Sequence, residues 1–370
     1  MKASGIVAEY NPFHYGHKYH IEQARLLTGA DVMIAAMSGN FVQRGEPAII
    51  DKWQRTECAL NNGIDIVFEI PFAFVCQAAS QYGSHGIDIL AKAGVSSVVF
   101  GSETGNLEEL QEIASLSFNV DNFRENMKKG YSYPASYGYM ADSYGPNDIL
   151  AISYLKALQN YPGITPYCVK RTNEYNDLQL SGQHASARAI REALLRHDDV
   201  SSYTPMAAQL LESPQVRLAD YYQMIRSRLL TCTPAELRDI FLVDEGIENL
   251  MIKNAYDCYD FDSFMDKCIT KRYTRSRIQR TLCQILVNNK RETMRKLPKY
   301  DIIRVLGFNE KGQQYLKQLQ ENGVRIANHY TANIKPYRDL EYRAAVIYGA
   351  LMDEEHQHYI NRSEISGLNL

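Results

Sequence analysis

Short apolar runs separated by helical patterns constrain the first two hundred residues of this chain more than any other feature. The runs Val32–Met37, Ile64–Ile70 and Val95–Phe100 have the length of strands rather than helices. Their mostly apolar character is typical of strands that are buried on both faces. A shorter run, Ile6–Ala8, precedes them. The sequence therefore predicts an α/β domain built on a parallel sheet with helices on both faces.

The polar loops after these strands are expected to share one face. Ligands of such sheets bind beside the C-terminal ends of the strands. The loops after Ala8, Met37, Ile70 and Phe100 should therefore surround one site. The loop 38–47 should lie beside the loop that follows the first strand.

From about residue 203 the strand signals vanish, and helical signals take over. Thr204-Pro205 is typical of a helix start, and Thr233-Pro234-Ala235-Glu236 predicts a capping box with proline at the first helical position. Further on, Ile278, Leu282, Ile285 and Leu286 form an apolar stripe at helical spacing. A chain of 370 residues exceeds one ordinary core. We therefore expect an α/β domain over residues 1–200 and a helical domain over 201–370.

Composition excludes several classes of protein. The chain is 45% hydrophobic and 22% charged, which fits a globular protein rather than a disordered one. The longest apolar run, Val32–Met37, is far shorter than the roughly 20 residues of a membrane span, and no secretory signal is evident. Seven scattered cysteines without a C-x-x-C pair argue against a disulfide framework and a structural zinc. They predict a reducing, cytoplasmic location.

One basic segment stands out from an otherwise acidic chain. The net charge is −3, yet residues 271–299 hold ten Lys or Arg and one acid. Local cations on an acidic protein indicate a localised anionic partner. The alternative is a solvated basic face. The candidate residues for binding this partner crowd the start of a predicted helix, where cations oppose the helix dipole unless an anion covers them. They are Lys271, Arg272, Arg275, Arg277 and Arg280.

A cluster of histidines lies between the first strand and the first helix. His14, His17 and His20 fall within seven residues, with Gly16 among them. Backbone N–H groups and the helix dipole at such a place favour phosphate. Gly16 would let a phosphate approach closely, and the His14 and His17 rings could stabilise charge on phosphate oxygens and on leaving pyrophosphate. We predict that His14 and His17 are the catalytic residues.

Two other interpretations of the histidines stay open at this stage. His-x-x-His-x-x-His could ligate zinc, although no cysteine or carboxylate lies nearby at ligand spacing. The rings could also merely cap and pack the helix. We predict no resident metal.

The wider pattern carries a resemblance to a known family. His14-Tyr15-Gly16-His17 resembles the HxGH motif of the nucleotidylyltransferase and class I synthetase superfamily. The stretch 7–14 is followed by Ser38-Gly39-Asn40-Phe41-Val42-Gln43-Arg44-Gly45-Glu46-Pro47-Ala48, then by residues 51–53, 65–71 and 100–103. In order and spacing these segments resemble the bacterial tRNA(Met) cytidine acetate ligase family.

That resemblance implies a Rossmann-like (HUP-type) nucleotidylyltransferase sheet and a two-step reaction. Acetate attacks the α-phosphate of ATP to give acetyl-adenylate and pyrophosphate, and the acetyl group then passes to the exocyclic amine of the wobble cytidine of elongator tRNA(Met). The resemblance implies ATP as substrate, with magnesium carried by the nucleotide, and no acetyl-CoA. The implied partners are tRNA and acetate, without a membrane.

The resemblance also implies which residues contact ATP. Gly101 would allow close approach of the nucleotide, Asn147 could donate and accept hydrogen bonds or merely cap a helix, and Arg171 could meet phosphate or ribose. A superfamily phosphate motif matches Ser186 and Arg191, although Arg188 stands where a threonine is usual. The remaining contacts are Val7, Ala8, Glu9, Tyr10, Asn11, Pro12, Phe13, His14, Tyr15, Gly16, His17, Lys18, Tyr19 and His20.

Alternatives to an acetate–tRNA ligase remain at this point. A small-molecule nucleotidylyltransferase would share the histidine loop but leave the basic segment idle. A non-catalytic RNA-binding protein with a relic nucleotide fold would not need His14, Gly16 and His17. Gln43 and Arg44 could hold acetate or a tRNA end, or merely pack their loop. The tyrosines of residues 131–144 could stack on bases, but a packed aromatic loop is the favoured interpretation.

Overall fold

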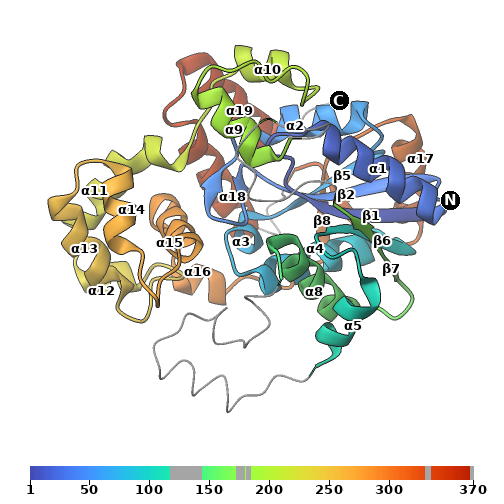
Figure 1. Cartoon of the computed structure of the whole chain (residues 1–370), viewed down its shortest axis with the longest axis horizontal. Coiled ribbons are helices and arrows are strands. Elements are labelled where there is room, and N and C mark those ends of the chain that lie inside the picture. The colour runs from blue at the N-terminus through green and yellow to red at the C-terminus, as the bar shows by residue number, and fades with distance from the viewer. Residues whose placement is uncertain (117–143, 172–179, 181–184, 330–334, 367–370) are drawn as a thin grey trace.

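The computed structural model describes residues 1–116, 144–171, 180, 185–329 and 335–366. In this part of the chain, a seven-stranded sheet (Figure 1) has the order β7-β6-β1-β2-β5-β8-β9, and a small hairpin pairs β3 with β4. The strands are β1 Ala3–Ala8, β2 Val32–Ser38, β3 Phe41–Val42, β4 Glu46–Pro47, β5 Ile66–Ile70, β6 Ser97–Ser102, β7 Thr165–Lys170, β8 Ile302–Phe308 and β9 Arg325–Ala327.

Helices cover the sheet and form a separate group beside it. The helices α11 to α14 lie together at one end of the molecule, away from β1 and β7 (Figure 1). The helices are α1 Tyr15–Thr28, α2 Lys52–Asn61, α3 Phe72–Val75, α4 Ala79–Lys92, α5 Leu107–Ser115, α8 Pro146–Leu158, α9 Ala187–Leu195, α10 Ala207–Glu212, the 3-10 turn η1 Leu218–Tyr221, α11 Tyr222–Thr231, α12 Pro234–Arg238, α13 Ile247–Asp257, α14 Phe261–Cys268, α15 Arg275–Val287, α16 Arg291–Arg295, α17 Glu310–Glu321, α18 Lys335–Gly349 and α19 Glu354–Ser366.

The predicted parallel sheet is confirmed for the first five strands of the main sheet. β1 pairs in parallel with β2 and β6, β2 with β5, and β6 with β7. Both faces are buried, because Ile34 and Ala36 of β2 pack into one core whereas Met33 and Ala35 pack into another. The loops that follow these strands therefore meet at one edge, as the sequence predicts.

The expectation that residues 201–370 are helical throughout is wrong. β8 pairs antiparallel with β5, and β9 pairs in parallel with β8, so this part of the chain widens the main sheet. The run Ile302–Phe308 carries a charge at Arg304, which disguises it as a surface segment in the sequence. The Arg304 side chain is fully buried because acidic residues from other elements neutralise it.

Helix-end signals were predictive at two places and misleading at one. Gly29 ends α1 in the left-handed conformation at φ 60°, and Thr233 with Glu236 forms the predicted capping box. Thr204 does not begin a helix, since α10 starts only at Ala207. The Thr204 hydroxyl instead donates to the Phe13 carbonyl at 2.5 Å, which fixes the end of the histidine loop.

The seven cysteines are free thiols, and five of them are buried. Burial raises the pKa of Cys58 to about 12 and that of Cys268 to about 11, so neither is a ready thiolate. Within the described ranges, no helix combines the length and the apolar character needed to cross a membrane.

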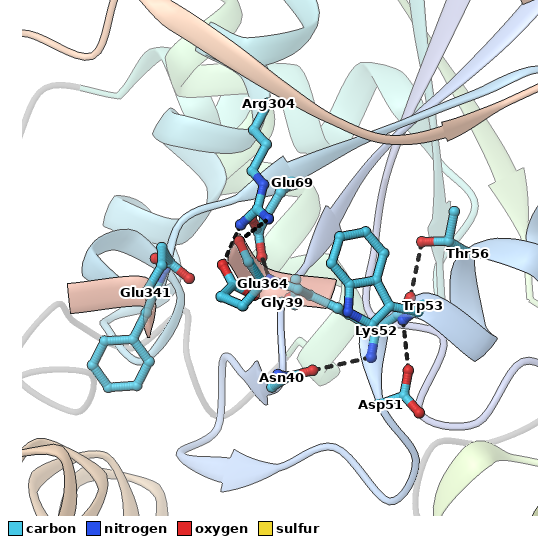
Figure 2. Close-up of polar contacts among 12 residues, drawn as sticks. Gly39, Asn40, Asp51, Lys52, Trp53, Thr56, Glu69, Arg304, Glu341 and Glu364 are labelled. Atoms are coloured by element: carbon cyan, nitrogen blue, oxygen red, sulfur yellow. Dashed lines mark hydrogen bonds and ion pairs between the residues drawn. The ribbon is translucent and has the colours of Figure 1, made fainter. Parts of the chain in front are cut away.

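A buried ionic cluster ties the C-terminal helices to the sheet (Figure 2). The Lys52 ammonium lies 2.6 Å from carboxylate oxygens of both Glu69 and Glu364. Arg304 pairs with the same two carboxylates, at 2.9 Å from Glu69. Glu341 lies beside them and accepts a hydrogen bond from the Phe72 backbone. Burial alone would raise the pKa of Glu364, but Arg304 and Lys52 lower it to about 2, whereas burial and the Glu69 charge raise the pKa of Glu341.

This cluster predicts opposite responses to two isosteric substitutions. Glu341 keeps its proton in the folded state while the unfolded chain ionises above about pH 4.5, so its contribution to stability is lost as the pH rises. Glu341→Gln should therefore match or exceed the wild type in stability at pH 8, with a gap that grows with pH. Glu364→Gln removes a paired charge and should cost about 2 kcal/mol at pH 7. Urea unfolding from pH 5 to 8 measures both, and an equal loss in the two variants would contradict the assignment.

Candidate active site

A cavity of about 630 Å³ opens at the C-terminal ends of β1 and β6. Most of the predicted ATP contacts line it. Four do not: Phe13 and Pro12 are buried in the core, Lys18 is exposed on α1, and Tyr15 lies outside the lining. The predicted residues that do line it are Val7, Ala8, Glu9, Tyr10, Asn11, His14, Gly16, His17, Tyr19, His20, Gly101, Asn147, Arg171, Ser186 and Arg191.

The two motif histidines stack at the start of α1. The His14 and His17 rings have centroids 3.6 Å apart and planes 22° apart. The His14 backbone N–H donates to His17 Nδ1 at 3.2 Å. That bond requires an unprotonated Nδ1 and leaves Nε2 of His17 as the N–H donor. The motif therefore presents an oriented imidazole donor at the positive end of a helix dipole.

Burial keeps the site histidines neutral. It lowers the pKa of His17 well below its usual range, with further lowering by the charges of His14, Arg171 and His20. Burial also lowers the pKa of His20 to about 4, with Arg171 adding to the effect. The guanidinium of Arg171 therefore acts on both rings. Since neutral imidazoles donate N–H bonds without repelling Arg171, rings and cation can serve one anionic ligand together.

The lowered pKa of His20 predicts an acid-labile fold. The unfolded chain binds the proton below about pH 6.5 and the folded chain only near pH 4, so this stability is present above pH 6.5 and lost on acidification. The loss that His20 contributes between pH 7 and pH 5 should be about 2 kcal/mol. Urea unfolding at the two pH values tests this, with His20→Asn as the variant that should lose less stability on acidification. An unchanged pH dependence in that variant would contradict it.

Contacts from distant segments hold the histidine loop in place. Arg191 of α9 donates to the Asn11 carbonyl at 2.6 Å, and the Asn11 side chain accepts from the Ile49 N–H at 2.8 Å. The Thr204 hydroxyl donates to the Phe13 carbonyl at the other end of the loop. The predicted neighbourhood of the loop 38–47 and the histidine loop is thereby confirmed, because the Gln43 N–H also donates to Glu9 at 2.8 Å.

On the β6 side of the histidines, three predicted nucleotide contacts come together. Gly101 is the residue before the last of β6, and a Cβ there would lie 3.4 Å from the Arg171 side chain, so its missing side chain leaves room in the cavity. Asn147 is not a helix cap, because Gly145 holds that position in α8. The Asn147 amide donates to Glu103 at 2.6 Å, and its carbonyl oxygen can still accept from a ligand.

The residues of the predicted phosphate motif, Ser186 and Arg191, also make contacts that stabilise the fold. The Ser186 hydroxyl accepts from the Ala189 N–H at 3.0 Å and so caps α9, as the sequence indicates. Arg188 also lines the cavity. Arg191 lies 3.8 Å from Glu46 in addition to its bond to Asn11. These contacts place cations of α9 around the same cavity as the histidines.

Comparison with known proteins identifies the family. A family model described as HIGH Nucleotidyl Transferase matches residues 1–363. The tRNA(Met) cytidine acetate ligase of Caldicellulosiruptor saccharolyticus is 38% identical over 385 residues, with 97% of this chain and 96% of the relative covered. The enzyme of that name from Bacillus subtilis is 35% identical over 392 residues, with coverage of 96% and 93%. This chain belongs to the tRNA(Met) cytidine acetate ligase family. It is therefore a ligase.

Solved structures of a family member agree with the fold. The crystal structure of TmcAL from Thermotoga maritima without ligand matches with a TM-score of 0.87 and 30% identity, covering 96% of each chain. A second crystal form of that protein, bound with alpha-thio ATP, matches with a TM-score of 0.85 at the same identity and coverage. The Rossmann-like nucleotidyltransferase fold predicted from the sequence is thus confirmed.

The zinc alternative finds no support in the geometry of this family member. The His14 and His17 rings lie face to face, so their nitrogens do not converge on a common point as zinc ligands must. In the part of the chain that the structure describes, the acidic and histidine side chains that do converge are Glu69, Glu341 and Glu364. Two buried cations, Lys52 and Arg304, already occupy the space around those carboxylates.

Acids outside the basic segment neutralise several of its arginines. Arg277 pairs with Asp244. Arg272 lies 3.8 Å from Glu245, and Arg275 lies 3.6 Å from Asp266. The count of charges over residues 271–299 does not include these acids, because they belong to preceding loops and helices. Arg280 differs from the other four, since it lines the cavity instead of the outer surface.

Sequence reasoning missed one residue that shapes the site. Arg55 of α2 is fully buried and donates to the Glu9 carbonyl at 2.6 Å and to the Ser38 carbonyl at 3.2 Å. It also donates to the Gly39 carbonyl. Arg55 thus joins the ends of β1 and β2 where the cavity begins. A lone arginine in a helix gives no such signal in the sequence. Of the tyrosine segment 131–144, only Tyr144 lies within the described residues, and it lines the cavity.

Proposed function

We propose that this chain uses ATP and acetate to acetylate the wobble cytidine of elongator tRNA(Met). In the first step, a carboxylate oxygen of acetate bonds to the α-phosphorus, and the bond to the pyrophosphate oxygen breaks. The products are acetyl-adenylate and pyrophosphate. In the second step, the exocyclic amine of the cytidine attacks the acyl carbon, AMP leaves, and the amine loses one proton. The names of the relatives and the alpha-thio ATP bound to one of them support this reaction.

The observation that carries the proposal is the stacked histidine pair inside the cavity. His17 has a fixed tautomer and a neutral ring, so its Nε2–H is ready to donate to an oxygen that gains charge as pyrophosphate leaves. Preorganised donors of this kind contribute about 10²–10³ in rate each. His14 assists from the N-terminus of the same helix. Arg171 supplies positive charge near the rings.

Nucleotide and metal have defined places in this proposal. The adenosine part lies over β6 and β7, beside Gly101, Asn147 and Arg171, and Ser186 and Arg191 lie toward the phosphates. Among the described lining residues the carboxylates are Glu9 and Glu46, which already accept from Gln43 and Gln279. Magnesium therefore arrives with the triphosphate. The acetyl group comes from acetate and not from acetyl-CoA, as the resemblance implies.

The proposal assigns tRNA recognition to the C-terminal part of the chain. The basic segment 271–299 includes α15 and α16, and Thr274, Ser276 and Arg280 at the start of α15 line the cavity. If about four phosphates are neutralised, the logarithm of tRNA affinity falls with the logarithm of salt concentration with a slope near −3 to −4. The enzyme works in the cytoplasm, where its thiols remain reduced.

Exchange of labelled pyrophosphate into ATP tests the proposed function. The full chain is assayed with and without acetate, and with and without tRNA. Exchange that requires acetate is the expected result. Exchange that requires a phosphorylated small acceptor instead would identify a small-molecule nucleotidylyltransferase. No exchange under any of these conditions, with tRNA binding intact, would identify a non-catalytic RNA-binding protein.

A further inference from the structure

Arg280 lies in the catalytic cavity although it belongs to the basic segment. It comes from the second turn of α15 and lines the cavity together with Gln43 and Arg44 of the β3–β4 hairpin. Thr274 and Ser276, at the start of α15, line the same end. This side of the cavity is therefore lined by an element that begins at Arg275, far beyond the end of β6 at Ser102 in the sequence.

The hairpin and α15 are fixed against each other by close contacts. Gly45 has φ 85°, and a Cβ there would overlap the backbone of Gln279 and Arg280. The Gln279 amide donates to Glu46 at 2.7 Å, and the Gln284 amide donates to the Cys76 carbonyl at 3.2 Å. The position of Arg280 is therefore set by rigid packing and not by the flexibility of a surface helix.

Among the residues that the structure describes, Arg280 has no counterion. Its guanidinium makes no hydrogen bond or ion pair with the described residues, in contrast to Arg272, Arg275 and Arg277. Burial, together with the charges of Arg277 and Arg44, lowers the pKa of Arg280 to about 10. A desolvated, repelled and unpaired guanidinium is unfavourable unless an anion joins it. The anion that Arg recognises best is a bidentate oxyanion such as phosphate.

The cavity has two ends, which are lined by elements from different parts of the fold. The predicted nucleotide contacts Gly101, Asn147 and Arg171 lie over β6 and β7, on one side of β1. Gln43 belongs to the β3–β4 hairpin and Arg280 to α15, and neither element carries one of these three contacts, so the adenosine part of the nucleotide does not account for them. This second end of the cavity is available to the molecule that receives the acetyl group.

We propose that Arg280 and Arg44 form a phosphate subsite that binds the RNA strand next to the target cytidine and thereby holds that base at the acyl-adenylate. This inference rests on the proposed function and assigns the second end of its cavity. The basic segment then contributes one cation to the cavity, while Arg272, Arg275 and Arg277 remain paired with acids outside it. Thr274 and Ser276 supply hydroxyl donors at the same end.

A salt titration of tRNA binding tests the subsite. The full chain and Arg280→Gln are compared for affinity to elongator tRNA(Met) over a series of salt concentrations. Loss of one phosphate contact should weaken binding about tenfold and reduce the magnitude of the salt slope by about 0.9. Arg325→Gln is the matched control, because Arg325 pairs with Asp301 at 2.5 Å on the edge strand β9, and it should keep the wild-type slope.

A modified RNA shows which phosphate is bound. A methylphosphonate placed 5′ or 3′ of the wobble cytidine, one at a time, removes a single charge. At one of the two positions it should weaken wild-type binding as much as Arg280→Gln does and should have no further effect in that variant. Additive losses at both positions would overturn the proposal.

ATP affinity, measured on the same preparations, separates the possible ligands. The loss of tRNA affinity in Arg280→Gln should exceed any loss of ATP affinity at least about tenfold. Equal losses would assign Arg280 to the triphosphate, and a raised KM for acetate in pyrophosphate exchange would assign it to the carboxylate. Either result overturns the subsite. The wild type could have a steeper salt slope than Arg280→Gln and yet show no acetate-dependent exchange. That result would leave the subsite standing and refute the proposed function.

Discussion

Replacing His17 with alanine should lower the rate of acetate-dependent pyrophosphate exchange by about 10²–10³-fold or more. His17 presents an Nε2–H donor in a fixed tautomer, because Nδ1 accepts the His14 N–H at 3.2 Å. Its ring also stacks on His14, so the alanine variant loses both the donor and the support of its neighbour. Initial rates of labelled pyrophosphate incorporation at saturating ATP and acetate measure the effect.

The control for His17 lies on the same helix. Lys18 is exposed and does not line the cavity, although the sequence resemblance includes it among the ATP contacts. Lys18→Ala should therefore keep exchange within about twofold of the wild type. His17→Gln retains an N–H donor at a different position and should recover only a small part of the rate. A His17→Ala variant that is folded and exchanges at the wild-type rate would exclude the proposed role of the ring.

Replacing Arg55 with alanine should destabilise the fold by about 4 kcal/mol. The side chain donates to the carbonyl oxygens of Glu9, Ser38, Gly39 and Ile50, and all of these bonds are lost together. Each buried polar group left without a partner costs about 1–3 kcal/mol, which water entering the space offsets in part. The charge of the buried Asp51 also loses its nearby cation. Urea unfolding followed by circular dichroism measures the loss.

Arg196 offers a matched control for Arg55. It is half exposed and pairs with Asp198 on the surface, so Arg196→Ala should change the free energy of unfolding by less than about 0.5 kcal/mol. Arg55→Lys keeps the charge but cannot reach four carbonyls, and it should fall between the wild type and Arg55→Ala. If Arg55→Ala is as stable as Arg196→Ala, Arg55 does not hold the strand ends together.

The sequence is most predictive where local pattern decides structure. The strands β1, β2, β5 and β6 appear as apolar runs, and the histidine motif lies directly between β1 and α1. The parallel order then places the loops of these strands at one edge, so the proximity of the histidine loop and the loop 38–47 also follows. These features need no information from distant parts of the chain.

Features that depend on distant partners could not be predicted. β8 carries a charge at Arg304 within an otherwise apolar run, and Glu69 and Glu364 from distant segments make burial of that charge possible. The acids opposite Arg272, Arg275 and Arg277 are likewise invisible to a local count of charge. The position of Arg280 inside the cavity follows from the contact of α15 with Gly45, which no pattern within either segment indicates.

A crystal structure of this chain with a non-hydrolysable ATP analogue tests the central role of the histidines most directly. The expected result is Nε2 of His17 within about 3 Å of a phosphate oxygen, with the adenosine over β6 beside Gly101 and Asn147. A complex in which the nucleotide is bound while the rings of His14 and His17 contact no phosphate would contradict it.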